Sequence, residues 1–111
     1  MPQDFSVSIE PGAGDEELVV AVRGEVDLLT APRLDEKLEE GVARRPVTLV
    51  VDLSGVTFID SSACNALVRG KRRADTGGVG LELRGLTPSC RRVLEIAGLL
   101  DLITIRQERQ R

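Results

Sequence analysis

One segment constrains the fold more than any other. The run VTLVVDL, from Val47 to Leu53, is apolar almost throughout and rich in β-branched residues. A strand with one solvated face alternates apolar and polar residues, whereas a nearly continuous apolar run is typical of a strand covered on both faces. Such strands lie at the centre of parallel sheets. The run therefore predicts a central parallel strand in an α/β protein.

Four further strands are predicted around this run. Phe5, Val7 and Ile9 alternate with polar residues, which is the period-two pattern of a strand buried on one face. The turn-rich PGAGDEE separates it from LVVAVRG at residues 18–24, so these two strands are expected to pair antiparallel. The last two strands are predicted at GLELRG, residues 80–85, and at LLDLITI, residues 99–105.

Helical patterns separate the later strands. The first helix is predicted to start with Thr30 as N-cap and Pro32 in its first turn, and its apolar stripe consists of Leu34, Leu38 and Val42. The second is predicted from about Ser61 to Ala74. It contains a glycine, Gly70, which indicates either close packing of the helix on the sheet or no special role.

The third helix repeats the Thr-then-Pro start at Thr87 and Pro88, and Gly98 is placed where a left-handed residue ends it. Its inner stripe is predicted to contain Val93, Leu94 and Ala97.

The resulting order is β-β-α-β-α-β-α-β, with right-handed crossovers between parallel strands. Polar residues on the second face of the first and fourth strands indicate that one sheet face is partly wet, so the helices should pack mainly on the other. These polar residues are Ser6, Ser8, Glu82 and Arg84. The 111 residues fit a single domain, 1–111, with residues 1–4 and 106–111 expected to fray.

Composition excludes several function classes. The chain has no histidine, which removes His-based catalytic triads and the common zinc ligand sets, so we expect no enzyme, no metal and no cofactor. A net charge of -3, with no Trp or Tyr, argues against nucleic-acid binding. Cys64 and Cys90 lack motif spacing and are expected to be reduced and buried. Without a membrane-spanning run or signal-like start, the protein is expected in the cytoplasm, with no membrane insertion.

One segment has the character of a site. A buried strand is predicted to end near Asp52, and the chain then crosses SGVTF into a helix at Asp60, Ser61 and Ser62. Asp60 as N-cap would place Ile59 and Cys64 in a hydrophobic staple. Ser61 would then be exposed at the positive end of the helix, where a phosphate would be stabilised. D-S-S is also an ordinary helix cap, and the two interpretations are compatible.

Three segments together resemble a known family. They are GEVDLLTAPRLDEKL at residues 24–38, VVDLSGVTFIDSSACNALV at 50–68 and LTPSCRRVLEIAGLLDLITI at 86–105. In this order and spacing they are similar to the STAS domain of anti-anti-sigma factors, the sigma-factor antagonists of sporulation and stress control. The resemblance spans nearly the whole chain and implies the STAS fold.

The resemblance also implies a function. The unphosphorylated protein would bind an anti-sigma factor that is a serine kinase and so free a sigma factor. The kinase would phosphorylate Ser61 and end binding, and a serine phosphatase would reverse this. ATP and magnesium would belong to the kinase. The site-supporting or partner-binding positions implied are Asp27, Thr30, Asp60, Ser62 and Ala63.

Two residues depart from the family pattern, which has Gly and Leu where this chain has Ala63 and Cys64. Ala63 could hinder close approach of a kinase backbone. Cys64 is expected to be a small apolar packing residue, with a reactive thiol as the alternative.

Two other functions stay open. One is a non-switching STAS subunit of a larger signalling or lipid-transport assembly, and the other is a small-ligand or nucleotide sensor. Either a monomer or a weak dimer is compatible with the sequence.

Overall fold

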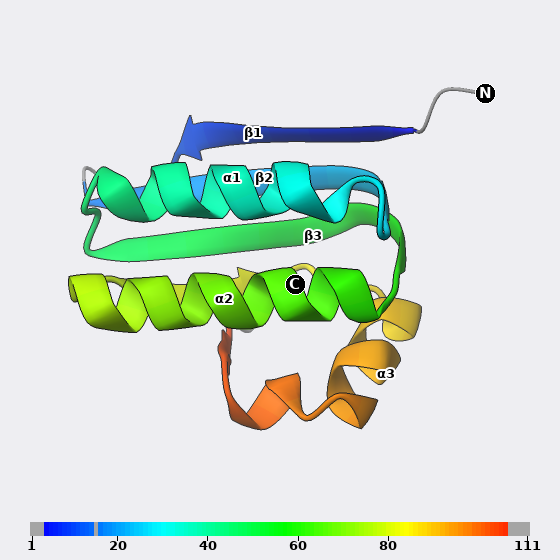
Figure 1. Cartoon of the computed structure of the whole chain (residues 1–111). Helices are drawn as coiled ribbons and strands as arrows, with labels where there is room; N and C mark the ends of the chain where they lie inside the picture. Colours follow the sequence, from blue (N-terminus) through cyan, green and yellow to red (C-terminus); the bar gives the residue numbers. More distant parts are fainter. Residues whose placement is uncertain (1–3, 15, 107–111) are drawn as a thin grey trace, which may run out of the picture.

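The computed structural model describes residues 4–14 and 16–106, which form one mixed sheet with helices against it (Figure 1). The strands are β1 (Phe5–Pro11), β2 (Glu17–Val26), β3 (Thr48–Ile59), β4 (Gly80–Arg84) and β5 (Thr104–Ile105), and they neighbour one another in chain order. The β1–β2 pair is antiparallel and the other pairs are parallel. The helices are α1 (Ala31–Ala43), α2 (Ser61–Gly77) and α3 (Pro88–Ile96), followed by a 3-10 turn, η1 (Leu99–Asp101). The predicted fold class and element order are confirmed.

The core lies on one face of the sheet. Figure 1 shows α1 and α2 side by side in front of the strands. Alternate residues of β2, β3 and β4 point towards these helices and are almost fully buried, together with the apolar stripes of α1 and α2. These buried strand residues are Val20, Val22, Leu49, Val51, Leu53, Leu81 and Leu83.

The other face of the sheet carries charged side chains, as predicted. Arg84 on β4 pairs with Asp52 on β3 at 3.1 Å between Nη2 and Oδ2. Arg106 reaches both Glu82, at 2.7 Å, and Glu17, at 3.0 Å. The predicted fraying therefore does not hold at Arg106, whose backbone N–H also donates to Leu83 O at 2.7 Å. The rest of that range, 107–111, and residues 1–3 lie outside the described residues.

The central strand is longer than predicted. SGVTF does not form a loop, because β3 continues through it to Ile59 and pairs with the second half of β2. Two register shifts in the β2–β3 pair accompany this extension. A β-bulge bends a strand and interrupts its alternation, so a period-two pattern along SGVTF is not visible in the sequence.

The C-terminal region differs from the prediction in two places. LLDLITI forms the η1 turn and only the two-residue strand β5. Thr87 caps α3, accepting from Cys90 N–H at 3.2 Å, and Gly98 is left-handed with φ 82°, as expected. Ala97, however, is exposed because α3 ends at Ile96, and the buried positions of this helix are Cys90 and Leu94.

Candidate functional site

The site is at the edge of the sheet where β2 and β3 end. Val26 pairs with Ile59, and because these strands are parallel, both segments leave the sheet at the same edge. The next residues are Asp27 and Asp60, and Asp60 N–H donates to Val26 O at 3.3 Å. The loop before α1 and the start of α2 are therefore neighbours, at the right of Figure 1.

Asp60 is the N-cap of α2, as predicted. Its backbone is extended, and its Oδ1 accepts from Ser62 N–H at 2.8 Å and from Ala63 N–H at 3.3 Å. Ile59 and Cys64 are both buried in the core cluster, as the predicted staple requires. These contacts fix the direction in which the chain enters α2.

Ser61 is the first residue of α2 and is exposed, while Ser62 is half-buried. An anion on Ser61 was expected to find free first-turn N–H groups, but those of Ser62 and Ala63 are already occupied by Asp60. Two of the first-turn donors are therefore already in use, and the carboxylate that uses them belongs to the residue directly before Ser61. Ala63 is only 1% exposed, so its methyl group does not stand in the way of a partner.

Thr30 is the N-cap residue of α1, as predicted, but its hydroxyl does not accept from the first turn of the helix. It makes no side-chain cap bond; its hydroxyl donates to Glu25 O at 2.8 Å and accepts from Asp27 N–H at 2.9 Å. Asp27 Oδ1 accepts from the N–H groups of Leu29 and Thr30, at 3.0 and 3.2 Å. Asp27 therefore orders the loop, and Thr30 is buried beneath it.

Sequence reasoning missed the exposed apolar residues at this end of the sheet. Leu28 and Leu29 are each 73% exposed, and Phe58 is 49% exposed. The signal was present, since two leucines stand in a turn between the polar residues Asp27 and Thr30. One of them, Leu28, lines a shallow pocket between the starts of α1 and α2. Its other lining residues are Ala31, Pro32, Ser62, Asn65 and Arg69.

Both cysteines are free and buried, as expected. Burial raises the pKa of the Cys64 thiol, and the Asp60 carboxylate raises it further. Although a helix N-terminus lowers a thiol pKa, these two effects dominate here. Cys64 is therefore a packing residue and not a reactive thiol.

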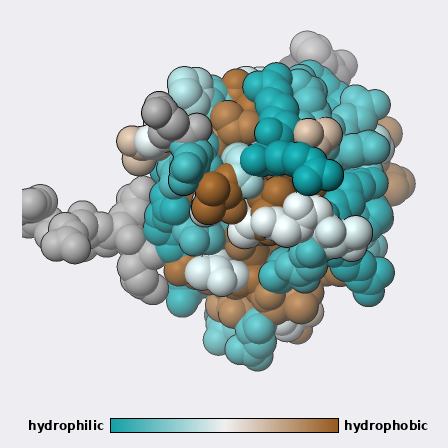
Figure 2. Space-filling view, turned by 90° about the vertical axis from the view of Figure 1, so that its left-hand side faces the viewer, coloured by the Kyte–Doolittle hydropathy of each residue, from teal (hydrophilic) through white to brown (hydrophobic). Residues whose placement is uncertain are grey.

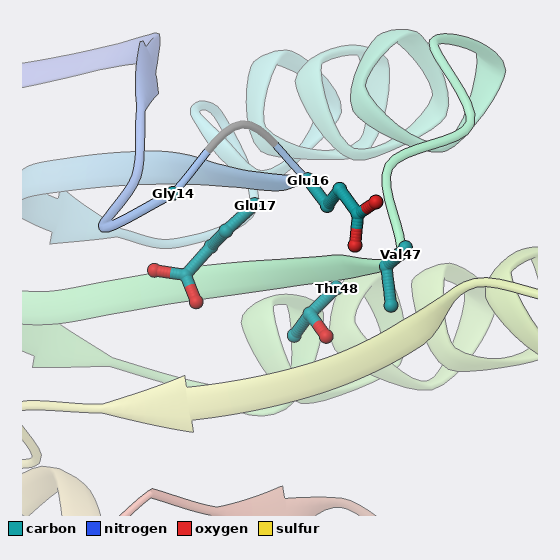
Figure 3. Close-up of a pocket in the computed structure, with 5 residues that line it drawn as sticks. All are labelled: Gly14, Glu16, Glu17, Val47 and Thr48. Carbon is teal, nitrogen blue, oxygen red and sulfur yellow. The ribbon is translucent and has the colours of Figure 1, made fainter.

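A second hollow lies at the opposite end of the molecule, where β2 and β3 begin. Figure 2 shows this side of the molecule, with apolar patches among hydrophilic surface. Gly14, Glu16, Glu17, Val47 and Thr48 line the hollow, and the two carboxylates point apart in Figure 3. The Glu17 carboxylate already accepts from Ala13 N–H and from Arg106. Across residues 4–14 and 16–106 there is no cluster of His, Cys, Asp and Glu suited to a metal ion, and none of the helices could cross a bilayer.

Comparison with known proteins identifies the family. A family model described as "Mlab, STAS domain" matches residues 9–104. The anti-sigma-B factor antagonist of Listeria monocytogenes is 32% identical over 103 residues, covering 92% of this chain and 90% of the relative. The chain belongs to the STAS family of anti-sigma factor antagonists.

Solved structures give the same result. The crystal structure of an anti-sigma factor antagonist from Mycobacterium paratuberculosis has a TM-score of 0.80 at 30% identity, covering 97% of this chain and 90% of that one. The phosphorylated form of the Bacillus cell fate determinant SpoIIAA shares the fold, with a TM-score of 0.68 at 19% identity and 93% of each chain covered. Anti-sigma factor antagonists are regulatory proteins and not enzymes.

Proposed function

We propose that this STAS protein binds an anti-sigma factor with serine kinase activity, that binding frees a sigma factor, and that phosphorylation of Ser61 ends it. The observation that carries the proposal is the position of Ser61. Its side chain is exposed at the first residue of α2, next to the loop that Asp27 orders. A kinase that docks on this edge of the sheet can reach the hydroxyl.

The charge of a phosphate supplies the switch. It adds about -1.5 to -2 at neutral pH, and it would be attached next to Asp60, whose carboxylate already holds two first-turn N–H groups. Because those two donors are occupied, they do not bond the phosphate, and its charge acts on the partner surface that docks at this end of the sheet. A partner surface that accommodates a neutral hydroxyl then meets a phosphate beside a carboxylate, which weakens docking.

The remaining components belong to partners. The kinase supplies ATP and magnesium, and a serine phosphatase restores the hydroxyl. We place these events in the cytoplasm, where sigma factors act.

The other functions considered have less support. A nucleotide or small-anion sensor would use free N–H groups at the start of α2, and Asp60 occupies two of them. A non-switching subunit of a signalling or lipid-transport assembly would leave Ser61 unmodified, so the experiment below separates it from the switch.

The test uses the anti-sigma factor kinases of the source bacterium, purified one at a time. Ser61→Ala should abolish phosphorylation in ATP, seen by intact mass, and should keep binding within about twofold by titration calorimetry. Ser61→Asp should weaken binding by about tenfold or more, because it places a carboxylate where the phosphate would be. Ser89→Ala is the matched control, since Ser89 is also exposed in the first turn of a helix.

Stoichiometric phosphorylation of the Ser61→Ala variant would refute Ser61 as the acceptor. Equal affinity of the unmodified and phosphorylated proteins would refute the switch and favour the non-switching subunit.

A further inference from the structure

The turn between β2 and α1 exposes two apolar side chains, one of them in the pocket at the start of α2. Leu28 and Leu29 are each 73% exposed, more than any other large apolar residue in the described ranges except Ile96. Leu28 also lines the pocket that Ser62 and Asn65 line from α2. Leu28 is thus part of the same surface as the start of α2, and Leu29 is the next residue of the turn. Both are solvated at a cost in free energy that docking would remove.

The backbone that presents these leucines is held on both sides. Asp27 O accepts from the N–H groups of Thr30, at 3.2 Å, and Ala31, at 2.8 Å, which closes a tight turn. Asp27 Oδ1 adds bonds from Leu29 and Thr30, and the Thr30 hydroxyl ties the turn to Glu25 O at the end of β2. We call the Asp27 carboxylate and the Thr30 hydroxyl the clasp.

Burial shows that Thr30 acts indirectly. Its side chain is only 4% exposed, and it is the one buried polar residue of the described part of the chain. Because a partner cannot touch it, the Thr30 hydroxyl can influence docking only through the shape of the turn. Preformed turns bind more tightly than mobile ones, since less conformational entropy is lost on binding.

We infer that the Leu28–Leu29 turn is a preformed apolar knob, held by the clasp, which inserts into an apolar cleft of the anti-sigma partner. This inference rests on the proposed function and names the chemistry of the partner surface. The cleft must lie close to the start of α2, because Leu28 and Ser62 line the same pocket. Thr30 is a positioning residue, and the leucines make the contact.

The experiment is a double-mutant cycle on affinity for the anti-sigma factor, measured with unphosphorylated protein. Leu28→Ala/Leu29→Ala should lower the affinity by about tenfold or more. Thr30→Val, which removes the hydroxyl at similar volume, should lower it by about threefold to tenfold, and Thr30→Ser should restore it. In the double-alanine background, Thr30→Val should have no further effect, because there is no knob left to position.

Two controls separate contact from general destabilisation. Ile96→Ala/Leu102→Ala removes other exposed apolar side chains, 78% and 47% exposed, and should leave affinity unchanged. Thr87→Val removes the hydroxyl that caps α3 and should lower stability without changing affinity.

Full binding by the double-alanine variant would overturn the knob, and an undiminished Thr30→Val effect in that background would overturn the clasp. The leucine variants alter exposed side chains, so they decide the knob even where Thr30→Val fails to fold. Failure of the proposed switch would appear differently. The kinase would then phosphorylate a residue other than Ser61, or phosphorylation would leave the affinity for the anti-sigma factor unchanged.

Discussion

The carboxylate of Asp60 shows how much one residue decides in this protein. It accepts the two N–H groups that open α2 and stands directly before the exposed Ser61. The cap was predictable because it uses residues two and three positions away, within the reach of a local hydrogen bond. The effect of this cap on an anion at Ser61 could not be predicted, because the effect depends on which N–H groups the cap occupies.

Two variants of Asp60 separate the contribution of its cap hydrogen bonds to stability from the contribution of its negative charge. Asp60→Ala should destabilise the protein by about 1 kcal/mol, because two first-turn N–H groups lose their acceptor. Asp60→Asn keeps an oxygen acceptor and should cost only a few tenths of a kcal/mol. Urea denaturation monitored by circular dichroism measures both. Equal destabilisation by Ala and Asn would show that the charge, and not the hydrogen bonds, stabilises this helix start.

At the scale of elements, Gly70 shows why α1 and α2 can lie close together. A methyl group at Gly70 would lie 2.8 Å from Leu38 Cδ1 on α1, and Leu38 is fully buried. Close packing was one of the two predicted explanations, but the neighbour is a helix and not the sheet. The sequence could not reveal this, since the two helices are brought together only by the strands between them.

Gly70→Ala should therefore destabilise the protein, although alanine favours a helix by up to about 1 kcal/mol over glycine. Overpacking against Leu38 costs about 1 to 3 kcal/mol and should outweigh that gain. Gly77→Ala is the matched control, because Gly77 is in the last turn of the same helix, α2. A methyl group there would make an ordinary 3.4 Å contact with Val42 of α1. In denaturant unfolding, the free energy of unfolding of Gly77→Ala should be higher than that of the wild type, and that of Gly70→Ala should be lower.

At the scale of the whole molecule, Arg106 joins parts of the sheet that are far apart in sequence. It bonds Glu82 on β4 and Glu17 on β2. The hydrogen bond from Arg106 is the largest cause that lowers the pKa of Glu17 from its ordinary value of 4.5, and the Ala13 N–H adds to it. The lowered pKa means that folding favours the ionised carboxylate.

A pH dependence follows from the sign of this shift. Because the folded-state pKa of Glu17 is depressed, its contribution to stability is complete above about pH 5 and is lost as the pH falls through the folded-state pKa. Arg106→Met should lower the free energy of unfolding at pH 7 and flatten its decline below about pH 5. Arg44→Met, which breaks an exposed pair with Glu40, should do neither to a measurable degree. This prediction would be contradicted if the free energy of unfolding of Arg106→Met declined below about pH 5 as steeply as that of the wild type.

The sequence by itself determined the order of strands and helices, the D-S-S helix start, the wet and dry sheet faces and the buried cysteines, because these follow from hydrophobic period and from hydrogen bonds between near neighbours. The tertiary structure alone decided that β3 runs on to Ile59, that the Asp27 turn lies beside Asp60, that the Thr30 hydroxyl supports a turn instead of accepting from the first turn of α1, and that Arg106 is paired. Each depends on the pairing and register of strands whose partners are distant in the chain, and local sequence does not specify that register.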